Sequence, residues 1–275
     1  MTPSPPRIPS SPAPSPAPSP AQPPAPSPSY SHGTSTTPLL GDTIGANLDR
    51  AIAAYPDREA LVDVPSGRRW TCAEFGAAVD EVARGLPAKR ITTGDRVGIW
   101  AVNCPEWVLT QYATARIGAI MVNINPAHRA HELEYVLRQA GVAVLIASLA
   151  HQGSDYRVLV DQVRGRCPEL REAVYIGDPS RDALTEAAAT VPHERLAAVA
   201  AGLSCDDPVN IQYTSGTTGF PEGATLSHHK RARTCEQAAH PHPDRSSART
   251  PRCARPSMRG CVHTEPYAGS PVKRS

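Results

Sequence analysis

The sequence predicts an α/β fold in which a mostly parallel β-sheet carries helices on both of its faces. Two observations in residues 39–229 lead to this prediction. Short apolar runs of strand length alternate with longer segments in which apolar residues recur every three or four positions. Glycine, proline and other turn-forming residues separate these segments. Strands that alternate with helices along a chain are typical of a parallel sheet.

Local signals justify the individual elements. Thr71 precedes an apolar helical stripe and can cap that helix, Pro105 suits a first helical turn, and Gly141 suits a helix end. The unbroken apolar run 142–147 is typical of a buried strand. In chain order we expect a helix over 43–55, a strand over 60–64, a helix from Thr71 to Leu86, a strand over 95–102, a helix from Pro105 through Tyr112, strands over 119–124 and 142–147 with a helix over 131–140 between them, a helix over 155–166, a strand over 173–176, a surface helix and linker over 179–207, and a strand over 209–213.

Composition divides the 275 residues into three domains with different properties. Residues 1–38 hold 14 of the 30 prolines and a single charge, so we expect a disordered leader rich in Pro, Ser and Ala. Residues 39–229 are the part that we expect to fold. Residues 230–275 contain ten basic and three acidic residues and no Leu, Ile, Phe or Trp, so we expect a basic, disordered tail, with a shifted reading frame as its explanation.

Charge and apolar patterning exclude several classes of protein. The net charge of +2 combines an acidic middle, with 17 basic and 23 acidic residues, and a basic tail, which argues against a uniformly basic nucleic-acid binder. No apolar run approaches the roughly 20 residues of a transmembrane helix, and the N-terminus shows no secretory leader. Seven cysteines without a C-x-x-C pair indicate reduced thiols, so we expect a cytoplasmic protein.

A loop rich in hydroxyl groups and glycine follows the last expected strand. Its hydroxyl residues are Thr214, Ser215, Thr217 and Thr218, and its glycines are Gly216, Gly219 and Gly223. Glycine lets backbone amides approach a ligand closely, and hydroxyls add donors. A strand that leads into such a loop can hold phosphate oxygens, although the spacing fits neither of the common glycine-rich nucleotide patterns. The alternative from composition alone is a polar surface turn.

Four segments in order resemble the AMP-forming (adenylate-forming) synthetases, in their fatty acyl-CoA synthetase branch. The loop itself, Tyr213-Thr-Ser-Gly-Thr-Thr-Gly-Phe-Pro-Glu-Gly-Ala224, is similar to that family's signature loop. The other segments are Arg69–Phe75, Gly94–Trp100 with Asn103–Trp107, and Gly118–Leu137. The resemblance covers about residues 42–229 and implies the N-terminal domain of an acyl-adenylate synthetase.

The resemblance also implies a reaction and its cofactors. A fatty acid would attack ATP to give acyl-AMP and pyrophosphate, and the thiol of CoA would then take the acyl group. Thr214, Ser215, Gly216, Thr217, Thr218, Gly219, Glu222 and Gly223 would bind the β and γ phosphates of ATP, with Mg²⁺ nearby. Glu222 stands where the family has lysine. A carboxylate there would repel a polyphosphate, so we expect weakened ATP binding.

The recognisable motifs end at His229. The resemblance implies catalytic and hinge motifs further along that residues 230–275 do not show, so no catalytic residue is assigned, and we expect an inactive N-terminal fragment of a fatty-acid–CoA ligase. Other functions remain as alternatives: a non-catalytic interaction fragment, or nucleic-acid binding through the basic tail. We expect His228 and His229 to be surface residues at a helix start, and Cys253, Cys261 and His263 fit no standard zinc site. Acyl chain length and oligomeric state stay open.

Overall fold

The computed structural model describes residues 41–214, 221–231 and 262–263, all within one compact unit, Leu39–Ser275. The expected leader, most of the expected basic tail, and Cys253 and Cys261 lie outside the described residues. Among the residues that are described, no helix is long and apolar enough to cross a membrane.

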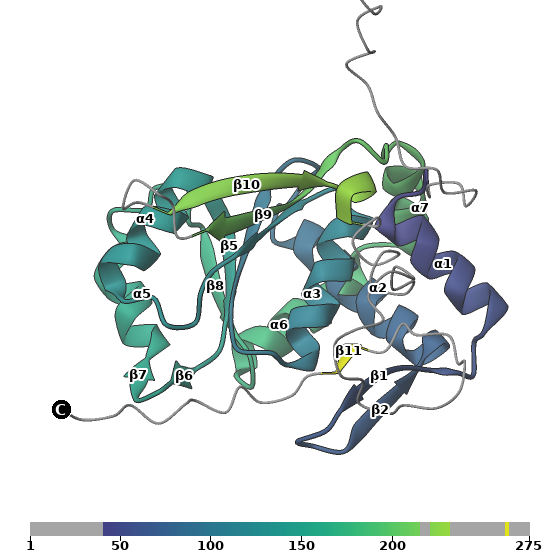
Figure 1. The fold of residues 1–275 in the computed structure, drawn as a ribbon, viewed down its shortest axis with the longest axis horizontal. Helices are drawn as coiled ribbons and strands as arrows, with labels where there is room; N and C mark the ends of the chain where they lie inside the picture. Colours follow the sequence, from purple (N-terminus) through teal and green to yellow (C-terminus); the bar gives the residue numbers. More distant parts are fainter. Residues whose placement is uncertain (1–40, 215–220, 232–261, 264–275) are drawn as a thin grey trace, which may run out of the picture. The chain divides into compact units, whose positions relative to one another are not determined.

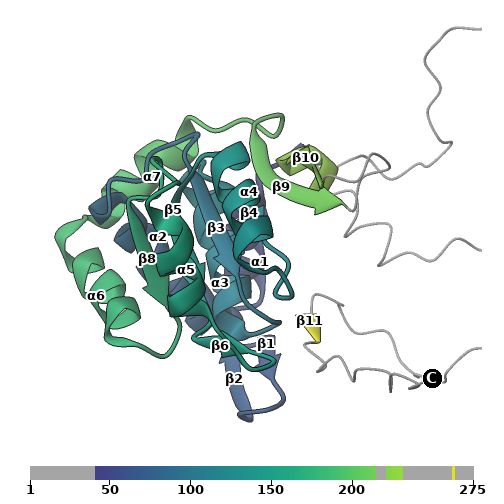
Figure 2. The same ribbon diagram turned by 90° about the vertical axis from the view of Figure 1, so that its left-hand side faces the viewer.

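The main sheet has six strands in the order β10–β9–β4–β3–β5–β8. Figure 1 labels β10, β9, β5 and β8 of this sheet, and Figure 2 labels β3 and β4. Its five strands from β9 to β8 are parallel, and β10 joins β9 in an antiparallel pair at the edge. This confirms the expected α/β class with a mostly parallel sheet. The strands are β3 (Arg96–Trp100), β4 (Ile120–Asn123), β5 (Val142–Ala147), β8 (Glu172–Tyr175), β9 (Pro208–Thr214) and β10 (Glu222–Ser227).

Helices cover both faces of this sheet. Helices α4 and α5 pack on one face, and α2 and α3 pack on the other (Figures 1 and 2). Leu145 and Ile146 are neighbours on β5 and belong to the two different cores, as strand alternation requires. The helices are α1 (Ile44–Ala54), α2 (Cys72–Ala88), α3 (Pro105–Arg116), α4 (Ala130–Ala140), α5 (Tyr156–Arg164), α6 (Pro179–Ala187) and α7 (His193–Ala201), with a short 3₁₀ turn, η1 (Ala188–Thr190).

The signals read from the sequence act where they were expected. The Thr71 hydroxyl accepts from the Glu74 amide, and the Glu74 carboxylate accepts from the Thr71 amide, so α2 begins with a capping box. Pro105 is the first residue of α3. Gly141 ends α4 with φ +61°, a left-handed conformation that favours glycine.

Several elements differ from the expectations. The stretch 179–207 contains two helices and a 3₁₀ turn, because Asp178 caps α6 and the Pro192 break starts α7. Four short strands were not expected: β2 (Arg68–Thr71), which pairs with β1 (Glu59–Asp63), the pair β6 (Ala150–His151) and β7 (Ser154–Asp155), and β11 (Val262–His263), which pairs with β1. Strand β10 was not expected either, and its first residues, Glu222 and Gly223, were expected to belong to the hydroxyl-rich loop.

The structure also corrects the expected position of His228, which is fully buried and not a surface residue. Its Nδ1 accepts a hydrogen bond, 3.1 Å long, from the amide of Ile44, the first residue of α1. Its neighbour His229 is partly exposed. The reason is that His228 satisfies a helix-start amide from a segment 184 residues earlier, a contact that local sequence does not reveal.

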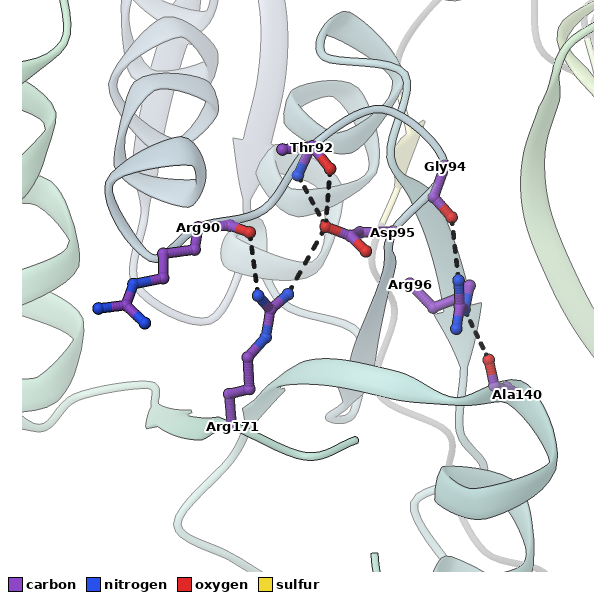
Figure 3. A network of polar contacts seen from close by, with 7 residues as sticks. All are labelled: Arg90, Thr92, Gly94, Asp95, Arg96, Ala140 and Arg171. Carbon is purple, nitrogen blue, oxygen red and sulfur yellow. Dashed lines mark hydrogen bonds and ion pairs between the residues drawn. The ribbon is translucent and has the colours of Figure 1, made fainter. Parts of the chain in front are cut away.

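Two arginines tie together the amino edge of the sheet, the edge where the parallel strands begin (Figure 3). The Arg96 guanidinium donates to the carbonyls of Ala140, at 2.8 Å, and Gly94, at 3.2 Å. Arg171 donates to the Arg90 carbonyl at 3.1 Å and lies 3.5 Å from Asp95. These contacts, called here the arginine clamp, give the Gly94-Asp95-Arg96 segment a structural role at the edge opposite the hydroxyl-rich loop.

Candidate functional site

The base of the hydroxyl-rich loop lies at the carboxyl edge of the sheet. Thr214 is the last residue of β9 and Glu222 is the first of β10, and the two are directly opposite each other in the antiparallel register. Gly223 is opposite Tyr213. Three of the eight predicted site residues are therefore placed together at the end of this hairpin. Ser215, Gly216, Thr217, Thr218 and Gly219 lie outside the described residues.

The two faces of the hairpin end carry different side chains. Directly opposed residues in a strand pair point to the same side, so Thr214 and Glu222 share one face and Tyr213 and Gly223 share the other. Both Thr214 and Glu222 are exposed. A Cβ at Gly223 would come within 3.0 Å of Ile211 Cγ2 and 3.3 Å of Tyr213 Cζ. Glycine at position 223 therefore leaves room for the tyrosine ring.

Two stacked aromatic rings support the neighbouring turn at the same edge. Trp100, the last residue of β3, stacks on Tyr156 with ring centroids 3.5 Å apart and planes 4° from parallel. The Trp100 indole donates to the Asn125 carbonyl at 2.9 Å, and the Tyr156 hydroxyl donates to the Pro126 carbonyl at 2.6 Å. Both rings are fully buried, and burial raises the pKa of Tyr156 to about 12. Two hydrogen bonds from these buried rings thus fix the turn between β4 and α4.

Amide side chains form a polar strip between β4 and β9. Asn123 Nδ2 donates to Gln212 Oε1 at 2.7 Å, and the buried Asn210 donates through Nδ2 to the Met121 carbonyl at 3.1 Å. Asn210, Gln212 and Thr214 occupy every second position of β9, so their side chains share one face. The strip therefore leads to the exposed hydroxyl of Thr214 and supplies polar groups on that side of the sheet.

Two titratable groups near this edge have pKa values shifted by burial. Burial lowers the pKa of His128, and the Glu132 carboxylate opposes that shift. His128 lies in the turn before α4 and is partly buried, while His131 is exposed on α4. Burial also raises the pKa of Tyr213 to about 12. Tyr213 and the polar strip thus give the hairpin one neutral apolar face and one polar face.

Metal-ligating side chains do not gather in the described parts of the chain: no group of three or more His, Cys, Asp or Glu residues is placed to hold an ion there. The oxygen donors described at the hairpin end are Thr214 and Glu222. Hydroxyl and carboxylate oxygens are the kind of ligand that Mg²⁺ accepts in proteins.

A family model described as "AMP-binding enzyme" matches residues 48–254, most of the chain. The chain belongs to the AMP-binding enzyme family. This match confirms the resemblance inferred from the loop and the three other segments. It continues past His229 to residue 254, whereas the recognisable motifs end at His229, so the domain boundary at 229 stays a prediction.

Relatives and solved structures agree with this membership. The chain is 38% identical over 221 residues to the medium-chain acyl-CoA ligase ACSF2, mitochondrial, of Danio rerio, and the alignment covers 73% of this chain and 36% of the relative. A Mycobacterium tuberculosis fatty acyl CoA synthetase is 25% identical with a TM-score of 0.56, over 68% of this chain and 34% of that chain. A long-chain-fatty-acid-CoA ligase from Archaeoglobus fulgidus has the same fold at 21% identity, with a TM-score of 0.64 over 77% of this chain and 41% of that one. The chain thus spans about a third of the length of the curated relative.

Reasoning from the sequence missed two features of the site. Tyr135 on α4 donates from its hydroxyl to the Pro221 carbonyl, 3.2 Å away, just before β10. The helical pattern of α4 highlights Leu133, Val136 and Leu137, which are buried, and gives no reason to single out Tyr135. The pairing of Asn123 with Gln212 joins residues 89 positions apart and needs the register of β4 and β9.

Proposed function

We propose that the hydroxyl-rich loop binds the β and γ phosphates of ATP in an acyl-CoA ligase reaction. The observation that carries this proposal is the position of Thr214 at the carboxyl end of a parallel strand, in a chain of the AMP-binding enzyme family. In open α/β sheets, ligands bind outside the carboxyl ends of the strands, where neighbouring connections leave in opposite directions. Strands β3 and β5 give such a reversal, because their connections lead to opposite sides of the sheet, and the end of β9 lies on the same carboxyl edge, separated from β3 by β4.

The reaction proposed for the family activity has two steps. A fatty-acid carboxylate attacks the α-phosphorus of ATP, the bond to the bridging oxygen breaks, and pyrophosphate leaves. The CoA thiolate then attacks the acyl carbonyl and AMP leaves. Thr214, together with the predicted Ser215, Gly216, Thr217, Thr218 and Gly219, would position the phosphates, and Mg²⁺ would neutralise charge on them. The names of the relatives support the acyl-CoA ligase part of this proposal.

Glu222 makes this site unusual in its charge. It is exposed and directly opposite Thr214. Its carboxylate would therefore lie close to phosphates bound by the loop. A carboxylate repels phosphate charge, although water and salt screen the repulsion at an exposed position. We therefore propose that Glu222 weakens nucleotide binding by about tenfold compared with lysine.

The 275 residues carry the loop, whereas the sequence shows no further catalytic motif of the family after His229. We propose that this polypeptide binds MgATP without making acyl-CoA. ATP–pyrophosphate exchange measured with fatty acids of several lengths tests this directly. No exchange is the expected result. Exchange, or acyl-CoA formation when CoA is added, would contradict it.

Calorimetric titration of MgATP into the full 275-residue chain tests the binding proposal. Thr214→Val removes the hydroxyl at the loop base and should weaken binding about fivefold, the effect of one hydrogen bond. Thr225→Val is a matched control, since Thr225 is also an exposed threonine of the hairpin, the fourth residue of β10. It should leave the dissociation constant unchanged. Equal effects of the two substitutions, or no binding to the parent chain, would overturn the proposal.

A further inference from the structure

Tyr135 contacts the residue that leads into β10 and lies near the end of β9, where the hydroxyl-rich loop is inserted. Its hydroxyl donates to the carbonyl of Pro221, the residue before β10, at 3.2 Å. Its ring and that of Tyr213, near the end of β9, both pack against the core under α4. The same helix α4 lies beside this end of the hairpin in Figure 1. The Tyr135 hydroxyl thus joins α4 to the residue before β10, and the rings of Tyr135 and Tyr213 share the core beside it.

The packing on this face leaves little freedom at the hairpin end. Tyr213 lies over Gly223, where an added Cβ would come 3.3 Å from the tyrosine Cζ and 3.0 Å from Ile211 Cγ2. Tyr135, Tyr213 and Gly223 therefore form a small cluster on the α4 side. Thr214 and Glu222 share the opposite face of the same residue pairs. A shift of the cluster would therefore move the two polar residues as well.

The start of α4 is itself fixed. The Trp100 indole and the Tyr156 hydroxyl hold the carbonyls of Asn125 and Pro126 in the turn that leads into α4. Helix α4 also buries Leu133, Val136 and Leu137 against the sheet. The hairpin beyond it is much less covered, since Glu222, Gly223, Ala224 and Thr225 are all exposed. The rigid helix is therefore the support to which the hairpin end is attached.

We propose that Tyr135 is a positioning residue for nucleotide binding, because its hydroxyl fixes Pro221 and so the orientation of Thr214 and Glu222. This inference rests on the proposed function of the loop. Tyr135 touches no ligand in this account and acts through the main chain of Pro221. An exposed hairpin end that is attached to a rigid helix loses less conformational entropy when it binds a ligand, so removing the attachment weakens binding.

The test compares Tyr135→Phe with the parent chain in two measurements. The substitution removes one oxygen and keeps the ring in the core. We expect the MgATP dissociation constant to rise about fivefold, as for loss of one hydrogen bond. In the nucleotide-free protein, hydrogen exchange at the amides of Glu222 and Gly223 should become several times faster, because the start of β10 opens more often.

Tyr175→Phe is the matched control. It removes the same atom from a buried ring at the end of β8, at the opposite edge of the sheet from the hairpin. It should leave both the MgATP affinity and the exchange at Glu222 and Gly223 unchanged.

The possible results separate the inference from the proposed function. Faster exchange with an unchanged dissociation constant would overturn the positioning role, as would equal losses of affinity in the two variants. If the parent chain binds no MgATP, the proposed function fails and the positioning role fails with it. Unchanged exchange at Glu222 and Gly223 in Tyr135→Phe would contradict the attachment itself, whatever the nucleotide result.

Discussion

The sheet body, made of β4, β3, β5 and β8, and the β9–β10 hairpin differ in what covers them. All six residues of β5 are buried, whereas the first four residues of β10 are exposed. Helices pack on both faces of the body, and the arginine clamp closes its amino edge. In the hairpin, β10 is held by its pairing with β9 and by the hydrogen bond from Tyr135 to Pro221.

This difference indicates how the two regions use their residues. In the body, a side chain is constrained by its neighbours, so changes there should act on stability. At the hairpin end, Thr214 and Glu222 face solvent, so changes there should act on binding and leave stability nearly unchanged. Four substitutions test this separation, beginning with the one expected to have the largest effect on stability.

Gly85→Ala should destabilise the body most. A Cβ at Gly85 would lie 2.3 Å from the backbone carbonyl oxygen of Leu184, so α2 and α6 would have to move apart. We expect the free energy of unfolding in urea to fall by about 3 kcal/mol. Gly165→Ala is the control: its backbone has φ −62° and nothing lies within 4 Å of the added methyl, so it should be neutral or slightly stabilising. Equal effects would contradict the packing argument.

Asp95→Ala should have the next largest effect. The Asp95 carboxylate accepts from the amide of Thr92 at 2.8 Å and from its hydroxyl at 3.1 Å, and it lies beside Arg171 in the clamp (Figure 3). Losing these partly exposed contacts should cost about 1–2 kcal/mol of unfolding free energy. Asp57→Ala, at an exposed position in the turn before β1, should cost much less. A clamp variant as stable as the parent would show that the amino edge does not depend on Asp95.

Because His228 is buried, we expect the stability of the chain to depend on pH. Burial lowers its pKa in the folded state, and the Asp207 carboxylate opposes that shift only in part. The unfolded chain therefore binds the proton more readily. The stability that neutral His228 contributes is fully present above the unfolded-state pKa of about 6.5, and it is lost as the pH falls below that value. The Nδ1 atom accepts from the Ile44 amide, and protonation there would remove that acceptor.

Urea unfolding at pH 7.5 and 5.5 measures the effect of His228. The parent chain should lose stability at the lower pH, by at most about 1.4 kcal/mol per pH unit for one proton. His228→Gln should lose less stability at the lower pH, because the variant lacks this titrating group. Some loss should remain in both proteins, because burial also lowers the pKa of His128. The same loss in both proteins would exclude His228 as the cause.

The fold was more predictable than the site, for physical reasons. Thr71, Pro105 and Gly141 act through their own helices, so the sequence around them contains the information needed. The hydroxyl-rich loop was recognisable for the same reason. Residues such as Tyr135 and His228 act on partners 86 and 184 positions away, and only the folded chain brings those partners together. Strand β10 escaped prediction because its exposed residues form no apolar alternation.

Glu222→Lys should change stability least and binding clearly, so it tests the central claim most directly. Residue 222 is exposed and opposite Thr214, and the substitution reverses the charge there without touching the core. The measurement is a calorimetric titration of MgATP into the parent chain and the variant, with the urea midpoint of each determined alongside. We predict about tenfold tighter binding by the variant, less at high salt, with an unchanged urea midpoint. Equal dissociation constants in the two proteins would contradict the account, because the hairpin end would then lie away from the nucleotide phosphates.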